Sequence, residues 1–378
     1  MINKVIILAA GSGKRMRESS PRSEKEIPKP LRKLLGIPII ERTVQRMIDL
    51  GLNLYIVIKP EDEKKFNEVL WKYNVKYIFQ TKPLGTADAL YSSKDFISDD
   101  LFLVSMGDDI SNISRENLTD SPSVFVQEIN DISTFGSVIV GKDSLVVDIK
   151  EKEGSGDGLA NTGIYIMHRS FFDIFHNIKA RENGEYYLTD ALTEMVRRGI
   201  SFKALPIGYW KPINTHEDLL RIEDELSKFD YTKLQIGLAK ESDFQDLVGL
   251  MMQLSKTSEK DKLKGLDPKE SFFKILSNEN EFISVSLYGK RVISSVMLII
   301  QDNISHGGRP YCHIENVVTD KGYRNMGIAL LNIRFILTLA RIHMCYKVIL
   351  NCRSELINYY KKSGFIASGE LEMRKNLD

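Results

Sequence analysis

Hydrophobic positions in the N-terminal part of the chain follow two different periods. Short apolar runs typical of buried strands alternate with segments whose apolar residues recur every three or four positions, the spacing of one helix face. Strands are predicted at Val5–Leu8, Leu54–Ile58, Lys76–Phe79 and Leu101–Val104, and helices over "IIERTVQRMIDLG" and "DEKKFNEVLWKYN". This alternation predicts βαβ units and a parallel sheet covered on both faces.

The pattern changes after this region. The apolar runs "SVFVQEI", "GSVIVGK", "VDIKEKE" and "NTGIYIM" follow one another without helical segments between them. Consecutive strands of this kind predict an antiparallel portion added to the parallel sheet. The helical segment "HEDLLRIEDELSKFD" then closes the first unit.

A second pattern begins at Leu234. It comprises the strand "LQIGLA", the helix "ESDFQDLVGLMMQLS", the strands "EFISVSLYG", "RVISSVMLIIQ" and "CHIENVVTD", the long helix "IALLNIRFILTLARIHM" and the strand "YKVILNC". We place the domain boundary near Asp230–Lys233, which gives a domain over 1–230 and another over 234–378. The expected fold class is α/β, with a Rossmann-like mixed-sheet domain followed by an α+β domain.

Composition supports two domains and restricts the partners. The 378 residues, 43% of them hydrophobic, suffice for two cores. With 52 Lys and Arg against 51 Asp and Glu, the net charge of +1 provides no footprint for nucleic acid or for a membrane surface, so small-molecule substrates are expected. The three cysteines lack C-x-x-C spacing and suit buried thiols in a reduced, cytoplasmic compartment. The longest apolar runs are too short to span a bilayer, and no signal peptide is apparent. The protein could be a monomer or an oligomer.

The glycine-rich turn "LAAGSGKRM" at 8–16 follows the first predicted strand. A dinucleotide-binding turn requires G-x-G-x-x-G, but Met16 occupies the third position after Gly11 and Gly13. A P-loop is excluded as well, since Leu8 and Arg15 stand where Gly and Ser or Thr are needed. Two interpretations remain: a turn whose backbone N–H groups approach phosphate oxygens beside Arg15, or a purely structural turn.

The motifs that follow resemble those of the sugar-1-phosphate nucleotidylyltransferases, over about residues 3 to 225. That family opens with L-A-A-G-x-G-T-R-M, from which this chain departs only at Lys14. Six further elements occur in the family's order: "PKPL", "QTKPLGTADAL", "VSMGDD", "FGSV", "EKE" with "NTGIYIM", and "EYYLTDAL". The resemblance implies attack of a sugar phosphate oxygen on the α-phosphorus of a nucleoside triphosphate, with release of pyrophosphate.

In this chemistry the protein gathers and neutralises several phosphates. By the resemblance, Arg15 grips the leaving pyrophosphate and Lys29 the attacking or α-phosphate. Gln80 and Gly85 read the pyrimidine edge through amide and backbone hydrogen bonds, which favours UTP or dTTP. The implied nucleotide site comprises Leu8, Ala10, Gly11, Gly13, Gln80, Gly85 and Thr86.

The resemblance also implies a Mg²⁺ site and a sugar site. Asp108 follows a strand and would hold Mg²⁺ through oxygen. Pro212 stands where many members have a second Asp, so Asn214 is chosen as the other ligand, as in bacterial uridylyltransferases of N-acetylglucosamine-1-phosphate. The sugar site is expected at Gly136, Glu151 and Asn161.

A second turn, "YRNMGIALL", precedes the long C-terminal helix, and N–H groups at a helix N-terminus again suit pyrophosphate. Here the sequence resembles the GNAT N-acetyltransferases, whose R/Q-x-x-G-x-G/A turn holds coenzyme A, over roughly residues 234 to 375. "HIENVVTD", "CYKVILNC" and "YYKKSGF" follow the eukaryotic-type glucosamine-6-phosphate N-acetyltransferases. The resemblance implies an acetyl-CoA site at Val317, Val318, Arg324, Asn325, Met326, Gly327, Ile328 and Ala329.

Acetyl transfer requires a proton for the departing thiolate, and Tyr360 matches the GNAT tyrosine that supplies it. His313 is interpreted as a packed histidine rather than a base. Asn316 and Asn351 replace Asp of the subfamily, and Leu356 replaces an Asn that contacts the cofactor. Near the end of the chain, Arg374 and Lys375 are candidate phosphate donors.

Together the two resemblances imply a bifunctional enzyme of UDP-N-acetylglucosamine synthesis. Its substrates would be an amino-sugar phosphate, UTP and acetyl-CoA, and glucosamine-6-phosphate is preferred over the 1-phosphate as acetyl acceptor. Two alternatives stay open. The Asn replacements allow another amino sugar, and Pro212 allows a regulatory or binding protein that keeps one inactive domain.

Overall fold

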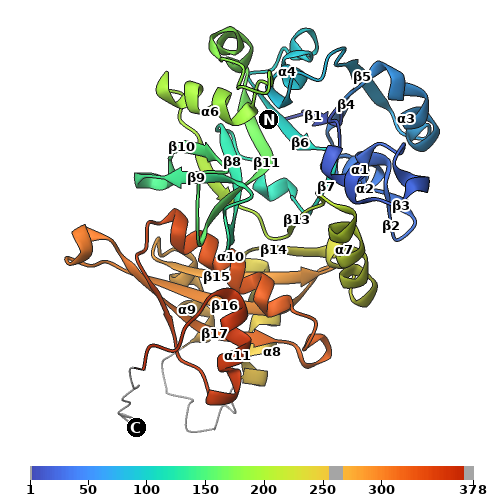
Figure 1. The fold of residues 1–378 in the computed structure, drawn as a ribbon. Coiled ribbons are helices and arrows are strands. Elements are labelled where there is room, and N and C mark those ends of the chain that lie inside the picture. Colours follow the sequence, from blue (N-terminus) through green and yellow to red (C-terminus); the bar gives the residue numbers. More distant parts are fainter. Residues whose placement is uncertain (1, 255–266, 370–378) are drawn as a thin grey trace. The chain divides into compact units, whose positions relative to one another are not determined.

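The computed structural model describes residues 2–254 and 267–369, and their contacts divide the chain into two compact units. Unit 1 comprises residues 1–127 and 131–234, and unit 2 comprises 128–130 and the chain from 235 onward. Figure 1 shows the elements of both units.

Unit 1 is built on a mixed nine-stranded sheet. Its parallel part has the order β5-β4-β1-β6, and helices lie between successive strands in the sequence (Figure 1). The bounds are β1 Lys4–Leu8, α1 Lys14–Ser19, β2 Lys33–Leu34, β3 Ile37–Pro38, α2 Ile39–Asp49, β4 Asn53–Ile58, α3 Glu63–Leu70, β5 Val75–Phe79, α4 Thr86–Tyr91 and β6 Leu101–Met106. The predicted βαβ arrangement is therefore present.

The antiparallel portion continues from β6. Strand β11 pairs with β6, β9 pairs with both β11 and β10, and β8 joins β11 to β12. A separate pair joins β7 to β13. The bounds are β7 Asp109–Ser111, β8 Ser123–Ile129, β9 Gly136–Val140, β10 Val146–Glu151, β11 Gly158–His168, α5 Phe171–Ile174, α6 Leu188–Arg197, β12 Lys203–Pro206, β13 Trp210–Pro212 and α7 His216–Lys228.

The strand order decides where a ligand can lie in unit 1. Chain order moves outward from β1 through β4 to β5 and then returns to β6 on the other side of β1. In open α/β sheets, ligands bind beyond the carboxyl ends of the strands where the order reverses. The glycine turn follows Leu8 of β1 and Asp108 follows Met106 of β6, so both lie at this point.

Unit 2 contains a five-stranded sheet of order β14-β15-β16-β17-β18. Strands β15, β16 and β17 are antiparallel, whereas β18 runs parallel to β17. The bounds are β14 Leu234–Leu238, α8 Phe244–Leu254, α9 Pro268–Leu276, β15 Glu281–Tyr288, β16 Arg291–Gln301, β17 Tyr311–Thr319, α10 Ile328–Ile342, β18 Val348–Leu350 and α11 Ile357–Tyr360. Apolar side chains of α8 and α9, among them Leu250 and Phe272, pack against the sheet.

Helix length and cysteine exposure can be compared with the expectations from composition. Among the described residues, none of the helices is long and apolar enough to cross a bilayer. Cys312 is buried and Cys345 is half-buried, but Cys352 is exposed, so the expectation of buried thiols is wrong for that residue. Cys352 lies in the loop after β18, which ends at Leu350.

Candidate active sites

The carboxyl ends of β1 and β6 bring a lysine and an aspartate into contact. Lys29 Nζ lies 2.6 Å from Asp108 Oδ2; the Lys29 side chain is largely buried, and that of Asp108 is 29% exposed. Gly13 has φ of 59°, and a Cβ placed on it would lie 3.3 Å from Lys29 Cβ. The glycine turn, the "PKPL" element and the "GDD" element, which are distant in sequence, therefore meet at one place.

The remaining predicted residues of the first turn differ in their exposure. Leu8 and Ala10 are buried, and the Leu8 carbonyl accepts a hydrogen bond from Gly107 N at 2.9 Å. Gly11 is exposed, and Arg15 is exposed on the first turn of α1. Among the described residues, the Arg15 guanidinium has no hydrogen-bond or ion-pair partner, so it is free to bind an anion.

Asp109 is a member of this site that sequence reasoning missed. Its carboxylate accepts a hydrogen bond from Trp210 Nε1 at 3.2 Å. Burial and the adjacent charge of Asp108 raise the pKa of Asp109 to about 7, against the lowering influence of Lys29 and of Trp210. The doubled acid of "GDD" was the available signal. Burial and the neighbouring Asp108 charge thus favour the protonated form of Asp109 more than for an ordinary carboxyl group.

The second predicted metal ligand, Asn214, follows the β7–β13 pairing. Pro212, the last residue of β13, is the partner of Asp109, and Asn214 follows two residues later, beyond the end of that strand. Its backbone N–H donates to Asp218 Oδ2 at 3.0 Å, and its side-chain amide has no partner among the described residues. No group of three or more His, Cys, Asp or Glu suited to a metal occurs among those residues. Mg²⁺ is commonly held by one or two protein oxygens together with phosphates and water, and therefore needs no such group.

The predicted base-reading residues form a tight hydrogen-bonded corner. Gln80 follows β5 and donates from Nε2 to Gly85 O at 3.1 Å and to Asp88 Oδ2 at 2.7 Å. Gly85 has φ of 100° and ψ of −178°, a region essentially restricted to glycine. The Thr86 hydroxyl accepts from Leu188 N at 3.0 Å, which fastens the loop to α6.

The three predicted sugar-site residues also converge. Gly136 is paired with Glu151 across β9 and β10, and a Cβ on Gly136 would lie 3.2 Å from Glu151 Oε2 and 3.4 Å from Asn161 Cβ. Asn161 Nδ2 donates to the Tyr165 hydroxyl at 2.8 Å, and its Oδ1 accepts from Gly163 N at 3.1 Å. Burial raises the pKa of Tyr165 above its ordinary value, so its hydroxyl stays neutral. The absence of a side chain at Gly136 leaves Glu151 accessible from that side.

A cavity of about 460 Å³ lies beside this group and is lined by Glu151, but not by Gly136 or Asn161. Its wall includes Arg181, which forms a bidentate pair with Asp190 at 2.8 and 2.6 Å. The Arg181 guanidinium also lies 4.6 Å from the centre of the Tyr187 ring. Sequence reasoning matched "LTD" to the family but assigned no role to Asp190, and only the fold shows that it fixes an arginine next to Glu151.

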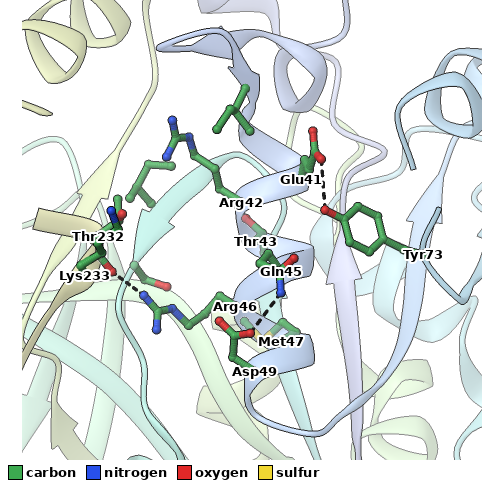
Figure 2. A pocket seen from close by; sticks show the side chains of 13 residues that line it. Glu41, Arg42, Thr43, Gln45, Arg46, Met47, Asp49, Tyr73, Thr232 and Lys233 are labelled. Carbon is green, nitrogen blue, oxygen red and sulfur yellow. Dashed lines mark hydrogen bonds between the residues drawn. The ribbon is translucent and has the colours of Figure 1, made fainter. Parts of the chain in front are cut away.

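Another cavity in unit 1, of about 370 Å³, contains none of the predicted site residues. Figure 2 shows it beside α2, with Arg42 and Arg46 projecting from successive turns of the helix. Several of its polar groups bind one another: Tyr73 donates to Glu41, Gln45 to Asp49 and Arg46 to the Thr232 carbonyl. Because these groups are already partnered, we assign no ligand to this cavity.

In unit 2 the predicted coenzyme A loop forms a compact turn. Asn325 and Gly327 are left-handed, with φ of 64° and 74°, and Gly327 is the N-cap of the 15-residue helix α10. The first turn of α10, which contains Ile328 and Ala329, has no acidic residue. The loop residues Arg324 and Asn325 are exposed, and Met326 is half-buried. The positive end of the helix dipole is therefore not compensated and suits an anion.

The neighbouring strand β17 has an irregular register that sequence reasoning did not predict. Two residues of β16, Ser295 and Met297, pair with Val318 and Glu315, so one extra residue bulges from β17. Asn316 is left-handed there, with φ of 53°, a conformation that Asn tolerates better than most residues. Strand β18 pairs with β17 only as far as Ile314. Val317 and Val318 thus lie on a strand edge that β18 does not cover.

Tyr360 ends α11, and its side chain is 7% exposed. Its hydroxyl has no hydrogen-bond partner among the described residues and is not sealed from solvent. Burial, with a smaller contribution from Cys352, raises the pKa of Tyr360 above its ordinary value of 10.0. His313 packs edge-on against Tyr311, as interpreted from sequence. Arg374 and Lys375 lie outside the described residues.

Comparison with known proteins agrees with these arrangements. Residues 4–228 match the model of the "Nucleotidyl transferase" family, and residues 250–365 match that of the "Acetyltransferase (GNAT) family". The Bifunctional protein GlmU of Methanococcus aeolicus is 31% identical over 62% of this chain and 57% of its own length. That of Methanococcus maripaludis is 35% identical over 57% of this chain and 52% of its own length.

The chain thus spans about half the length of the curated relatives it matches. A solved structure of a Bacillus anthracis protein assigned as a glucose-1-phosphate thymidylyltransferase covers 58% of this chain and 94% of its own. It is 25% identical, with a TM-score of 0.51. The chain therefore belongs to the nucleotidyl transferase family and carries an acetyltransferase domain of the GNAT family in its C-terminal part.

Proposed function

We propose that residues 1–230 transfer a uridylyl group from UTP to N-acetylglucosamine-1-phosphate, giving UDP-N-acetylglucosamine and pyrophosphate. The observation that carries this proposal is the contact between Lys29 and Asp108. Asp108 follows the carboxyl end of β6, and Lys29 lies next to Gly13. Lys29 offers a positive charge for a phosphate group, Asp108 offers an oxygen ligand for a metal ion, and the glycine turn lies next to them. The same fold could use dTTP, since uracil and thymine present the same polar groups to Gln80.

The reaction requires positioning and charge stabilisation rather than a covalent intermediate. A phosphate oxygen of the sugar would attack the α-phosphorus in line with the departing pyrophosphate. Lys29, released from Asp108 on substrate binding, would neutralise charge on the attacking or α-phosphate. Arg15, exposed and without a partner among the described residues, would hold the pyrophosphate. Gly136, Glu151 and Asn161 would hold the sugar.

Mg²⁺ fits the residues present. Asp108 and Asp109 are adjacent carboxylates; burial is the main cause of the raised pKa of Asp109, and the Asp108 charge adds to it. A divalent cation would relieve the repulsion between the two groups. Asp108 and the side-chain oxygen of Asn214 would hold the ion. When bound, it would supply additional neutralisation of the phosphate charge.

We further propose that residues 234–378 transfer an acetyl group from acetyl-CoA to the amine of glucosamine phosphate. The turn 324–329 and the uncovered edge at Val317 and Val318 would hold the pyrophosphate and the pantetheine arm. The neutral amine would attack the thioester carbonyl, its extra proton would go to solvent, and Tyr360 would protonate the departing thiolate. Its raised pKa keeps the phenol protonated at neutral pH.

The preferred acetyl acceptor is glucosamine-6-phosphate. This choice rests on the likeness of "HIENVVTD", "CYKVILNC" and "YYKKSGF" to acetyltransferases that use the 6-phosphate. A mutase that moves the phosphate to the anomeric position would then be needed between the two activities. Direct transfer of product from one domain to the other would not occur.

One assay tests both activities. The pure protein receives acetyl-CoA, UTP, Mg²⁺ and one amino-sugar phosphate at a time, while free thiol and UDP-sugar are followed separately. Thiol release with glucosamine-6-phosphate and UDP-sugar from N-acetylglucosamine-1-phosphate are the expected results. Faster thiol release with glucosamine-1-phosphate, accompanied by UDP-N-acetylglucosamine, would overturn the choice of the 6-phosphate. Turnover only with a different amino sugar would support the alternative suggested by Asn316 and Asn351, and no turnover would favour a binding protein.

A further inference from the structure

Gln80 has an amide whose orientation is determined by its surroundings. The residue is 5% exposed, and both acceptors of its Nε2 group, Gly85 O and Asp88 Oδ2, lack a proton to donate. Reversing the amide would place Oε1 against two other oxygens, at 3.1 and 2.7 Å. The amide nitrogen must therefore face the loop, and Oε1 must face away from it.

Oε1 is the atom left for a ligand. It has no donor among the described residues, and it is absent from the buried atoms that lack a partner, so it keeps access to solvent. The glutamine consequently presents a hydrogen-bond acceptor to its site and no donor. An acceptor at this position recognises a ligand N–H and repels a ligand lone pair.

Asp88 is the stronger of the two anchors. It lies on α4, one turn from Gly85, and its carboxylate accepts the shorter of the two bonds. Hydrogen bonds to a charged acceptor are roughly twice as strong as neutral ones. No cation or other donor contacts this half-buried carboxylate among the described residues. Its one side-chain hydrogen bond among those residues is with Gln80, so ion pairing does not explain its presence.

We propose that Asp88 is a positioning residue that holds Gln80 Oε1 toward the nucleotide base, so that the site selects bases with an N3–H group and rejects cytosine. This inference rests on the proposed uridylyl transfer. Uracil and thymine carry a proton on N3, which Oε1 accepts, whereas N3 of cytosine carries a lone pair that Oε1 repels. Gln80 thus distinguishes the pyrimidines, and Asp88 makes this possible by fixing the orientation of its amide.

The test compares UTP and CTP in the wild type and in Asp88→Asn. The substitution keeps the shape of the side chain, but its amide can donate to a reversed Gln80 as well as accept from the present one. We expect the ratio of kcat/KM for UTP over CTP to fall by about 10-fold or more, mainly through KM. Asp95→Asn removes the same charge from an exposed position outside this corner and should leave the ratio unchanged.

A double-mutant cycle separates positioning from a general structural effect. In a Gln80→Ala background, Asp88→Asn should produce no further change in the UTP to CTP ratio, because the group it orients is gone. Should Asp88→Asn fail to fold, Asp88→Ala replaces it in the same cycle, since it also removes the anchor.

The outcomes distinguish the inference from the function. A wild type that prefers UTP, with an unchanged ratio in the Asp88 variant, would overturn the role of Asp88 and leave uridylyl transfer intact. A wild type that uses CTP as well as UTP would also overturn the inference. No turnover with any nucleoside triphosphate and sugar-1-phosphate would overturn both.

Discussion

Lys29 Nζ and Asp108 Oδ2 lie 2.6 Å apart, and each neutralises the other in the absence of substrate. A triphosphate and a metal ion would offer each partner a more strongly charged ligand. The pair thus keeps two charged groups ordered and accessible at the carboxyl ends of the central strands. Removing either group should affect the chemistry more than the fold, since Asp108 is not fully buried.

Lys29→Ala should slow nucleotidyl transfer by about 100-fold or more, in line with the loss of other preorganised charge-stabilising groups. Pyrophosphate release in steady state measures the effect. Lys33→Ala, which removes an exposed lysine from β2, is the matched control and should retain activity. Wild-type turnover of a folded Lys29→Ala protein would contradict the role given to this residue.

Removal of metal should separate the two activities. A chelator should abolish formation of UDP-sugar, because Asp108 and Asn214 would lose the ion that neutralises phosphate charge. Thiol release from acetyl-CoA should continue, and added Mg²⁺ should restore the first activity. Equal sensitivity of both activities to the chelator would argue against the metal assignment.

Gly85→Ala should disrupt the base-reading corner. The backbone conformation is restricted to glycine, and the new Cβ would lie 2.5 Å from Tyr186 O. Strain of this kind costs about 1–3 kcal/mol, so the midpoint of chemical denaturation should fall and KM for UTP should rise. Gly184→Ala provides the control, because Gly184 also has positive φ but nothing within 4 Å. Equal losses of stability in the two variants would show that only the positive φ matters. The close approach of Gly85 to Tyr186 would then be unimportant.

Tyr360→Phe keeps the ring and its packing against Tyr359 and Phe365 but deletes the hydroxyl. Stability should therefore change little, whereas acetyl transfer should slow by about 10²–10⁴-fold, as expected for a lost general acid. Tyr359→Phe deletes the neighbouring hydroxyl and should leave the rate close to wild type. Normal thiol release by Tyr360→Phe would return Tyr360 to a packing role.

The pH dependence of acetyl transfer should reflect the same phenol. A raised pKa favours the protonated form, so the general acid remains competent throughout neutral and mildly alkaline pH and is lost only above its ordinary value of 10.0. We expect no fall in kcat attributable to Tyr360 below that pH, in a pH–rate profile of thiol release. An alkaline limb below pH 10 that disappears in Tyr360→Phe would show that Tyr360 titrates there, and would contradict the raised pKa of its hydroxyl.

The sequence alone determined many of the elements, the positions of the two glycine turns and the identity of many candidate residues. Apolar periodicity is a local property, so strands such as β1 and helices such as α2 followed from it within a few residues. Ordered motifs likewise placed Lys29, Asp108 and Tyr360 among the candidates before any contact was known.

Only the tertiary structure decided which of these residues meet. Gly136, Glu151 and Asn161 converge because β9 lies between β10 and β11, and strand order depends on long-range pairing that no local pattern records. The left-handed bulge at Asn316 depends on the register between β16 and β17. Asp88 is part of the motif "LGTADAL", but the sequence does not show that it accepts a hydrogen bond from Gln80. That bond depends on the turn of the chain at Gly85. Hydrogen-bond direction at a buried amide is set by the neighbours that folding supplies, and for this reason the acceptor offered to the base could not be read from the sequence.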